Sequence, residues 1–376
     1  MKYIKIALKL LISFKFEILK PTYKKFLIFD NTNSNLIKKY LKSKYAILYT
    51  RNEKFNLYVL LKNFLKGKFN KKEYLESYIK FVDPKIIITT IDNNPFFYEL
   101  QKQSYQKKIL LQTAWKYPLF DFNILDYKKK KKIIRNNNFN LDIAIVYNKH
   151  IGGIFKNLNT KKIIQNGSLK SNDHKISKKK EIDLVFISCW ANVNFSENIA
   201  DNFSYKQFFD KQAKVLFYLG RYSDKYNLNL HILGKRADSE LEFNYYNDIF
   251  KNKIKWKFIE GNKYNPYKIV DSSKIVFNLY STLGYEALSR GNKTIFFNPF
   301  KKIFKNLNFG WPCEKFKSEG PFWTEKIDYN NMEKIINFVR YMNKKKFLDL
   351  RKKYIQDLMI YRSKNLNLKR ILRDLN

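Results

Sequence analysis

Short apolar runs that each end in a polar turn recur along the first half of the chain. They stand at residues 25–29, 45–49, 86–91, 109–112 and 141–147. Segments with helical spacing, such as 56–64 and 74–81, lie between them. Runs that are apolar throughout predict strands buried on both faces. Their alternation with helices predicts a parallel sheet covered by helices on both sides.

The same pattern restarts after a polar break at residues 166–180. The later apolar runs stand at residues 183–188, 228–234, 255–259, 275–278 and 294–298. We therefore predict an α/β chain of two Rossmann-like, doubly wound lobes joined by a linker. The predicted N-terminal lobe is 22–165, the linker is 166–180, and the C-terminal lobe with C-terminal helices is 181–376. Ligands of such sheets bind outside the carboxyl ends of the strands, which predicts a site in the cleft between the lobes.

Residues 1–21 predict an amphipathic helix in the membrane interface. Polar side chains recur at helical spacing through residue 20, most others are Ile, Leu, Phe or Tyr, and Pro21 ends the segment. The charges interrupt the segment too often for a membrane span, which needs about 20 mainly apolar residues. A helix that packs on the protein's own core is the alternative interpretation.

The formal net charge is +41, because 74 Lys and Arg face 33 Asp and Glu. Such a surface attracts anionic lipid headgroups and phosphates. Part of the charge follows from a composition rich in Lys, Asn, Ile, Phe and Tyr, as an AT-rich genome imposes. The lysines are spread along the chain and accompany no nucleic-acid-binding motif, so no nucleic-acid partner is expected. The run 128–132 is interpreted as a solvated loop, with contact to anionic lipid as the alternative.

The sequence lacks the motifs that are typical of several classes of enzyme. The chain has no phosphate-binding P-loop, no GxGxxG fingerprint, no GxSxG elbow and no Asp-x-Asp pair. Its cysteines, Cys189 and Cys313, and its three histidines form no metal-binding spacing. We therefore expect neither a metal site nor a cofactor.

The sharpest local feature is the segment 271–297. An apolar strand at 275–278 is followed by a tight turn in which Ser281 or Thr282 can cap a helix that Gly291 ends. Glu286 falls in the first turn of that helix. Backbone N–H groups at a helix start attract anions, so the segment predicts a diphosphate site, and a capped helix without ligand is the alternative.

This segment resembles the donor-binding region of the two-lobed GT-B glycosyltransferases. More broadly, the chain over residues 25–330 resembles the bacterial surface carbohydrate biosynthesis proteins, a glycosyltransferase-like family. The matching segments are 28–30, 49–53, 88–94, 166–172, 281–291 and 320–323. By position, the resemblance implies donor binding by Ser281, Thr282, Gly284 and Glu286. It also places Arg290 where it could pair with phosphate, with a salt bridge on the helix surface as the alternative.

The catalytic base is expected in the first lobe, since an inverting GT-B transferase must deprotonate the acceptor hydroxyl. Asp92 is the first choice and Asp30 the second, because each ends a buried strand in a polar turn; an Asx-turn is the alternative for both. Lys235 is expected to bind the donor, and Arg51 is a second candidate cation at a strand end. The other expected cleft residues are Asn93, Asn166, Gly167 and Ser168.

Together these features predict transfer of a sugar from a nucleotide-sugar to a surface polysaccharide or lipid-linked acceptor. The nucleotide-sugar is a substrate, and the mechanism is expected to be independent of metal. The protein would work in the cytoplasm, at the inner face of the membrane. Alternatives on the same fold are transfer of a polyol phosphate from a CDP-linked donor and epimerisation of a UDP-sugar. A basic nucleic-acid-binding protein is a distant alternative.

Overall fold

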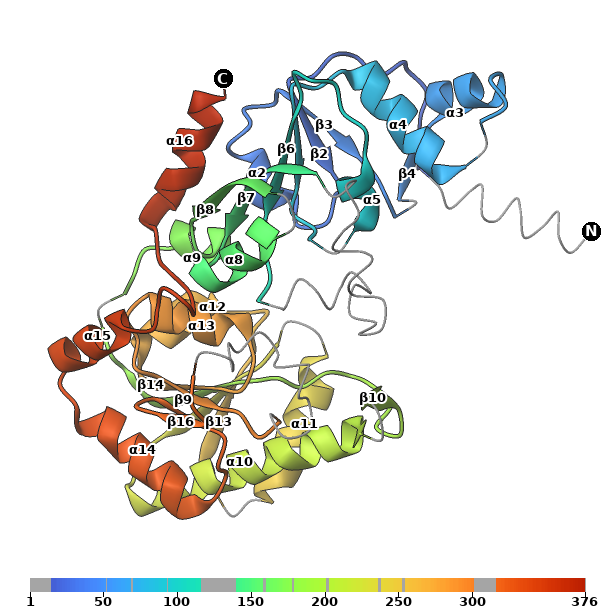
Figure 1. The fold of residues 1–376 in the computed structure, drawn as a ribbon. Coiled ribbons are helices and arrows are strands. Elements are labelled where there is room, and N and C mark those ends of the chain that lie inside the picture. Colours follow the sequence, from blue (N-terminus) through green and yellow to red (C-terminus); the bar gives the residue numbers. More distant parts are fainter. Residues whose placement is uncertain are drawn as a thin grey trace, which may run out of the picture.

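The computed structural model arranges the chain in two α/β lobes, one above the other in Figure 1. It describes residues 15–51, 53–68, 70–92, 94–115, 140–157, 160–177, 179–200, 203–235, 238–251, 254–300 and 316–375. Within these residues, the first lobe contains a six-stranded sheet and the second a seven-stranded sheet. The predicted doubly wound α/β fold is confirmed.

The sheet of the first lobe is parallel throughout, with strand order β3-β2-β5-β6-β7-β8. Its strands are β2 (Phe26–Phe29), β3 (Tyr45–Leu48), β5 (Ile86–Thr89), β6 (Lys107–Leu111), β7 (Leu141–Val146) and β8 (Thr160–Gln165). Side chains alternate between two apolar cores, one on each face of the sheet. One face packs against α3 (Leu57–Phe64), α4 (Lys71–Val82), α5 (Pro95–Glu99) and α8 (Lys149–Asn157). The other packs against α2 (Asn35–Lys38), α9 (Leu169–Asp173) and α16 (Leu366–Asp374).

The sheet of the second lobe has strand order β13-β12-β9-β14-β15-β17-β16, and only the last pair among these strands is antiparallel. Its strands are β9 (Ile182–Ile187), β12 (Leu230–Leu233), β13 (Trp256–Ile259), β14 (Ser273–Asn278), β15 (Thr294–Phe297), β16 (Glu319–Gly320) and β17 (Trp323–Thr324). A large aromatic core joins one face to α10 (Tyr205–Lys225), α11 (Ser239–Phe250), α14 (Tyr329–Tyr341) and α15 (Lys344–Lys352). The other face packs against α12 (Pro266–Ser272) and α13 (Thr282–Ser289). A small antiparallel pair, β10 (Asn198–Ala200) and β11 (Phe203–Ser204), precedes α10.

Each sheet has a point where the strand order reverses. In the first lobe the chain runs from β2 out to β3 and then returns to β5 on the other side of β2. In the second lobe it runs from β9 through β12 to β13 and returns to β14 beside β9. Such switch points open a crevice at the carboxyl ends of the strands, which is where ligands of this kind of sheet bind.

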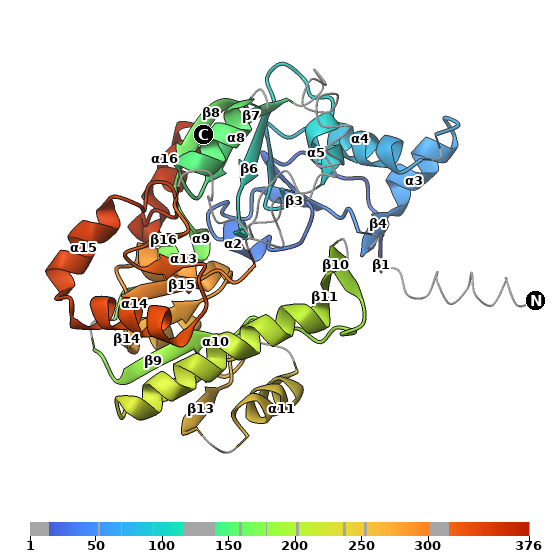
Figure 2. The same ribbon diagram turned by 60° about the horizontal axis from the view of Figure 1, so that its bottom comes forward.

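The chain crosses between the lobes twice. The first crossing, between β8 and β9, contains the segment 166–180 that the sequence predicts as a linker. The second follows α15 and passes through the 3₁₀ turn η1 (Ser363–Asn365) into α16. Figures 1 and 2 show α16 beside the first lobe, where Leu368, Ile371 and Leu372 join its core. The predicted second lobe, 181–376, therefore includes a terminal helix that packs on the first lobe instead, because that helix has a strongly apolar face to bury.

The predicted amphipathic helix is wrong for the part of residues 1–21 that the structure describes. Residues 15–17 form β1 (Lys15–Glu17), which pairs in parallel with β4 (Lys54–Asn56), and residues 18–21 are not helical. The neighbouring strand supplies backbone partners, and an ion pair of 2.5 Å joins Glu17 to Lys54. Residues 1–14 and the lysine run 128–132 lie outside the described residues.

Among the described residues, no helix combines the length and the apolar character needed to cross a bilayer.

Candidate functional site

The start of α13 lies at the switch point of the second lobe. Gly284 packs so closely on the side chain of Asn278 that an added Cβ would lie 2.1 Å from Asn278 Cγ. Asn278 in turn fixes the turn after β14, since its Oδ1 accepts from the N–H of Ser281 at 3.1 Å and its Nδ2 donates to the Ser281 carbonyl at 3.2 Å. The glycine therefore seats the helix on the strand end. Ser281 occupies the N-cap position, but its hydroxyl makes no capping hydrogen bond, so the predicted hydroxyl cap is replaced by Asn278.

Two backbone N–H groups at the start of α13 are available to bind a ligand. Within the described residues, the N–H groups of Thr282 and Leu283 donate to no protein group. The hydroxyl oxygen of Thr282 accepts from the backbone N–H of Trp115, in the first lobe, at 3.0 Å. The helix start thus faces the first lobe and carries the partial positive charge that attracts anions.

Lys235 lies near the same switch point. It comes two residues after the end of β12, and its side chain is exposed. Its Nζ lies 3.4 Å from the Cys189 carbonyl oxygen at the end of β9, and the Tyr280 hydroxyl donates to that oxygen at 3.0 Å. The buried carboxylate of Glu242 holds the strand ends together, accepting from the Ser188 hydroxyl and, at 2.8 Å, from the backbone N–H of Lys235. A cation, a phenol and a helix start therefore meet at one edge of the sheet.

Glu286 does not face this edge. Its carboxylate is buried and accepts hydrogen bonds from the Ser168 hydroxyl and, at 3.1 Å, from the Tyr267 hydroxyl. Burial raises the pKa of Glu286 to about 7, although the two hydrogen bonds oppose the increase. The predicted donor ligand is instead a contact between α13, α12 and the linker in this structure.

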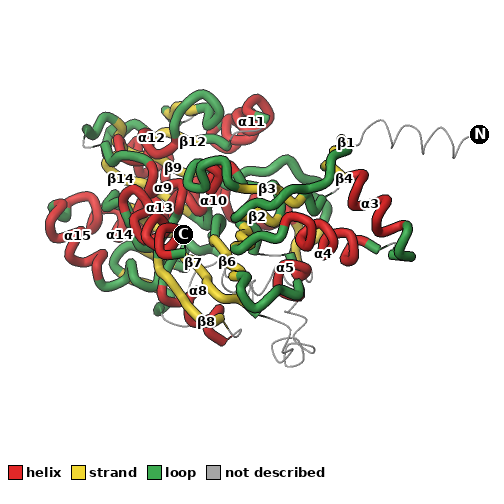
Figure 3. The backbone as a smooth tube through the Cα atoms, turned by 90° about the horizontal axis from the view of Figure 1, so that it is seen from above, coloured by secondary structure: helices red, strands yellow, loops and turns green. Residues whose placement is uncertain are grey.

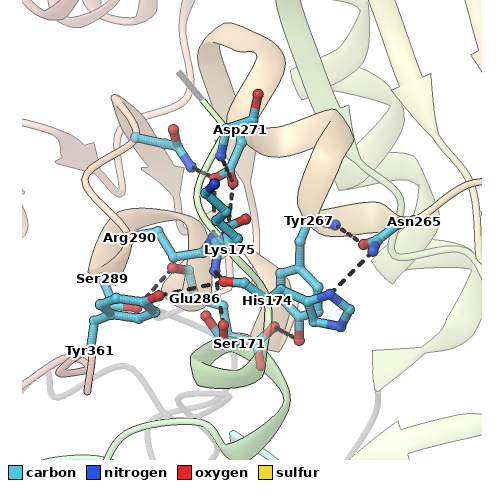
Figure 4. A network of polar contacts seen from close by, with 12 residues as sticks. Ser171, His174, Lys175, Asn265, Tyr267, Asp271, Glu286, Ser289, Arg290 and Tyr361 are labelled. Carbon is cyan, nitrogen blue, oxygen red and sulfur yellow. Dashed lines mark hydrogen bonds and ion pairs between the residues drawn. The ribbon is translucent and has the colours of Figure 1, made fainter. Parts of the chain in front are cut away.

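Arg290 is also structural, and the expectations of a phosphate ligand or a surface salt bridge are both wrong. Its side chain is fully buried (0% exposed) and forms an ion pair with Asp271, 2.5 Å from Nη2 to Oδ2 and 3.0 Å from Nε to Oδ1. The remaining N–H groups donate to the carbonyls of Ser171, His174 and Lys175 at 2.8, 2.9 and 3.1 Å (Figure 4). All five guanidinium donors are therefore used within the protein.

Asn166, Gly167 and Ser168 lie where the two crossings meet. Asn166 Nδ2 donates to Asn365 Oδ1 at 2.9 Å, and Asn365 Nδ2 donates to the Leu169 carbonyl at 2.9 Å. Gly167 has a φ of +70°, and an added Cβ would lie 2.0 Å from the Ile360 carbonyl oxygen. Asn166 and Gly167 thus join the linker to the returning chain, whereas Ser168 joins the linker to Glu286 of α13.

In the first lobe, Asp30 and Asp92 flank the switch point between β2 and β5. Asp30 is buried and accepts from the Thr32 N–H at 2.8 Å, the Thr50 hydroxyl at 2.5 Å and Arg51 Nε at 3.0 Å. Burial alone would raise the pKa of Asp30, but these hydrogen bonds outweigh it and lower the pKa. Arg51 is about half exposed at the strand ends. The Asp30 carboxylate therefore holds its own turn, through Thr32, to the segment after β3, through Thr50 and Arg51.

Asp92 follows β5, on the other side of the switch point from Asp30. Its backbone carbonyl accepts from the Tyr98 hydroxyl at 2.9 Å, which fixes the turn after β5. Burial raises the pKa of Tyr147, and the charges of Glu286 and Asp92 raise it further. The pKa of the Tyr147 phenol thus responds to a carboxylate from each lobe. Asn93 lies outside the described residues.

An aromatic stack that sequence reasoning missed connects the lobes. The ring of Trp115 stacks on Tyr285 of α13 at a centroid distance of 4.0 Å and lies nearly parallel to Tyr147 at 6.0 Å. Trp115 follows β6, and Tyr147 follows β7. Both residues come at or shortly after the end of an apolar run, which is the sequence signal that could have indicated a site. An aromatic residue after a strand predicts core packing as readily as a site.

The described residues contain no group of three or more His, Cys, Asp or Glu side chains that could hold a metal ion.

Comparison with known proteins places the chain in a family. The family model described as "putative O-antigen biosynthesis protein" matches residues 123–376, about two thirds of the chain. The chain belongs to this family. The predicted relation to surface carbohydrate biosynthesis proteins is thereby confirmed. No curated protein sequence matches the chain.

Solved structures show the fold. A variant of the wall teichoic acid polymerase TagF has a TM-score of 0.51 at 11% identity, covering 94% of this chain and 90% of that chain. A second TagF variant has a TM-score of 0.51 at 12% identity, with 95% and 88% covered. A variant of TarM from S. aureus, in complex with ligands that include UDP, has a TM-score of 0.46 at 17% identity, with 82% and 59% covered. The likeness to TagF confirms the predicted GT-B fold.

Replacing Arg290 tests whether its ion pair supports the fold. We expect Arg290→Gln to lower the free energy of unfolding by about 3–5 kcal/mol, because Asp271 would stay buried without its partner. The matched control is Lys274→Gln, which breaks the partly exposed pair with Asp183 (2.7 Å) and should cost at most about 1 kcal/mol. Urea unfolding measures both, and equal small losses would contradict a structural role for Arg290.

Glu286 should make stability depend on pH. A carboxyl whose folded-state pKa lies near 7 rather than 4.5 binds its proton more tightly in the folded protein. Its stabilising contribution is complete below about pH 4.5 and is lost as pH rises to about 7, by an amount on the order of 3 kcal/mol. Glu286→Gln should remove this loss, so the variant gains stability relative to the unchanged protein between pH 5 and pH 8. Urea unfolding of both proteins at pH 5 and pH 8 measures this effect. If the difference in unfolding free energy between the two proteins were the same at both pH values, the raised pKa of Glu286 would be contradicted.

Proposed function

We propose that this protein transfers a sugar from a nucleotide-sugar donor to an acceptor glycan of O-antigen assembly. The observation that carries the proposal is the start of α13 at the switch point of the second lobe, with the exposed cation of Lys235 at the same sheet edge. Family membership supports O-antigen as the class of product, and ligands of doubly wound sheets such as these two bind at the carboxyl ends of the strands.

The donor diphosphate would bind at the α13 start. The backbone N–H groups of Thr282 and Leu283 and the hydroxyl of Ser281 would donate to its oxygens, and Lys235 would supply a positive charge. These groups stabilise the negative charge that develops on the leaving nucleoside diphosphate, which is the task that a metal ion performs in other transferases. Gly284 acts indirectly, because it lets the helix start lie close to Asn278.

The acceptor would enter from the first lobe, with Asp92 as the base. Asp92 takes the proton of the acceptor hydroxyl, the hydroxyl oxygen bonds to the anomeric carbon, and the bond from that carbon to the diphosphate oxygen breaks. The bonding pair leaves with the nucleoside diphosphate. Asp92 is favoured over Asp30 because three hydrogen-bond donors already occupy the Asp30 carboxylate. The charge of Asp92 also raises the pKa of Tyr147, whose ring lies nearly parallel to that of Trp115, and this supports the choice of Asp92.

We also propose that the acceptor is attached to lipid and that the protein works on the cytoplasmic side of the membrane as a peripheral protein. The net charge of +41 supports contact with anionic lipid.

Donor binding can be tested with a panel of UDP-, GDP-, CMP- and CDP-sugars and a CDP-polyol. We expect one nucleotide-sugar to raise the melting temperature and to release its nucleotide on turnover. Lys235→Gln should lower kcat/KM for that donor by about tenfold or more, because a phosphate contact is lost. Lys274→Gln, at the amino end of β14, is the matched control and should leave turnover unchanged. Release of CMP from a CDP-polyol, without turnover of any sugar donor, would contradict sugar transfer.

The base can be tested with two matched carboxylate replacements. Asp92→Asn should lower kcat by roughly 10²–10⁴-fold with little change in stability, because Asn keeps the backbone contact to Tyr98. Asp30→Asn should instead lower the free energy of unfolding, by roughly 1–3 kcal/mol, since it weakens the buried contacts to Thr50 and Arg51. Steady-state turnover and urea unfolding distinguish the two, and normal turnover of Asp92→Asn would remove Asp92 from the mechanism.

A further inference from the structure

Helix α3 exposes an apolar face at one end of the first lobe. Leu61, Phe64 and Leu65 are 63%, 65% and 76% exposed, and we name these three residues the α3 patch. Their spacing of three and four residues puts them on one side of the helix and its C-terminal end. The opposite side buries Val59 and Asn63. Single exposed apolar residues are ordinary, whereas a contiguous group of large ones marks an interaction surface.

The apolar surface extends beyond the α3 patch. A hollow of about 600 Å³ between α3 and the start of α4 is lined mainly by Phe55, Leu57, Leu60, Leu61, Phe64 and Tyr74. Ile18 and Leu19 are also strongly exposed. They follow β1, which pairs with β4 immediately before α3, and the Asn56 side chain donates to the Leu19 carbonyl at 2.9 Å. The exposed apolar residues therefore lie on two neighbouring segments that strand pairing and a hydrogen bond join.

Exposed lysines lie beside this apolar surface, and two of them, Lys68 and Lys71, line the hollow. Residues 54–72 contain six lysines and no Asp or Glu. Five of them are exposed and form no ion pair with a carboxylate in the described part of the chain: Lys62, Lys66, Lys68, Lys71 and Lys72. Long lysine side chains can keep their ammonium groups in water or at headgroups while apolar neighbours enter a less polar layer.

The positive charge and the exposed apolar residues together favour one kind of binding partner. A second copy of the chain would bring two sets of exposed lysines together, which is unfavourable. An anionic bilayer instead offers acyl chains to the apolar residues and phosphates to the lysines. Figures 1 and 3 show α3 at an end of the first lobe that points away from the second lobe. A flat surface could therefore approach α3 without meeting the second lobe.

We propose that the α3 patch docks the first lobe on an anionic membrane. Leu61, Phe64 and Leu65 enter the boundary between headgroups and acyl chains, and the surrounding lysines contact headgroup phosphates. The docking surface deepens the membrane contact of the proposed function, but its test needs neither donor nor acceptor. Its failure is thus distinguishable from failure of the transfer reaction.

The experiment is flotation of the full chain with vesicles of equal parts phosphatidylglycerol and phosphatidylcholine, compared with phosphatidylcholine alone. We expect binding to the anionic vesicles, and a fall of about tenfold or more in the partition coefficient when the three residues of the α3 patch are replaced by Ser. The matched control replaces three residues that are about half exposed on helices of the second lobe, Phe217, Leu241 and Phe338, by Ser. That control should bind as the unchanged protein does.

Circular dichroism and the melting temperature verify that both triple variants fold. Replacing Lys62, Lys66 and Lys68 by Gln should weaken binding to anionic vesicles at low salt and reduce its salt dependence. Equal vesicle binding by the α3-patch variant and the unchanged protein would overturn the proposal. So would a dimer, detected by sedimentation, that the patch variant converts to a monomer while vesicle binding persists.

Discussion

The buried ion pair between Arg290 and Asp271 fixes the geometry on which the candidate donor site depends. Arg290 ends α13 and Asp271 lies in α12, while the three carbonyls that Arg290 binds belong to residues 171–175 of the linker. One guanidinium group thus joins both helices on one face of the second sheet to the chain that enters the lobe. A buried charge pair is stabilising only when its remaining donors and acceptors are satisfied, and here all five donors are. The position of the linker and the orientation of α13 are therefore set together.

This arrangement gives the two ends of one short helix different tasks. The start of α13 presents backbone donors at the switch point, where a diphosphate is proposed to bind. Farther along, Tyr285 stacks on Trp115 of the first lobe and Glu286 accepts from Ser168 of the linker. A change in the angle between the lobes would have to break these contacts, and they lie one turn from the donor groups. Donor binding as proposed would therefore take place one turn from contacts that hold the lobes together, and one of those contacts involves a carboxyl group, Glu286, whose pKa is raised to about 7.

The sequence predicts those features of the fold that depend on the local pattern of residue types. Strands buried on both faces must be apolar throughout, so their positions and the two-lobed α/β fold follow from residue type alone, as does the strand-turn-helix at 273–289. It does not predict contacts between distant segments. Arg290 binds carbonyls more than a hundred positions earlier, and backbone carbonyls leave no signal in residue identity. For the same reason the sequence places α16 in the wrong lobe and predicts a helix over residues 15–17, which form a strand where β4 offers backbone partners. Trp115 and Tyr147 were missed because an aromatic side chain after a strand predicts a core as readily as a site.

The proposed membrane surface and the proposed reaction place consistent demands on the two lobes. The α3 patch belongs to the first lobe, and so does Asp92, the group proposed to activate the acceptor. A lipid-linked acceptor lies at the membrane, whereas a nucleotide-sugar diffuses in water. Docking through α3 would hold the acceptor lobe at the lipid surface and leave the donor lobe in solution, joined by the two crossings that meet at Asn166 and Asn365. The positive charge that is most useful for docking is then the charge around α3, where exposed apolar residues and exposed lysines occur together, rather than the net charge of the chain.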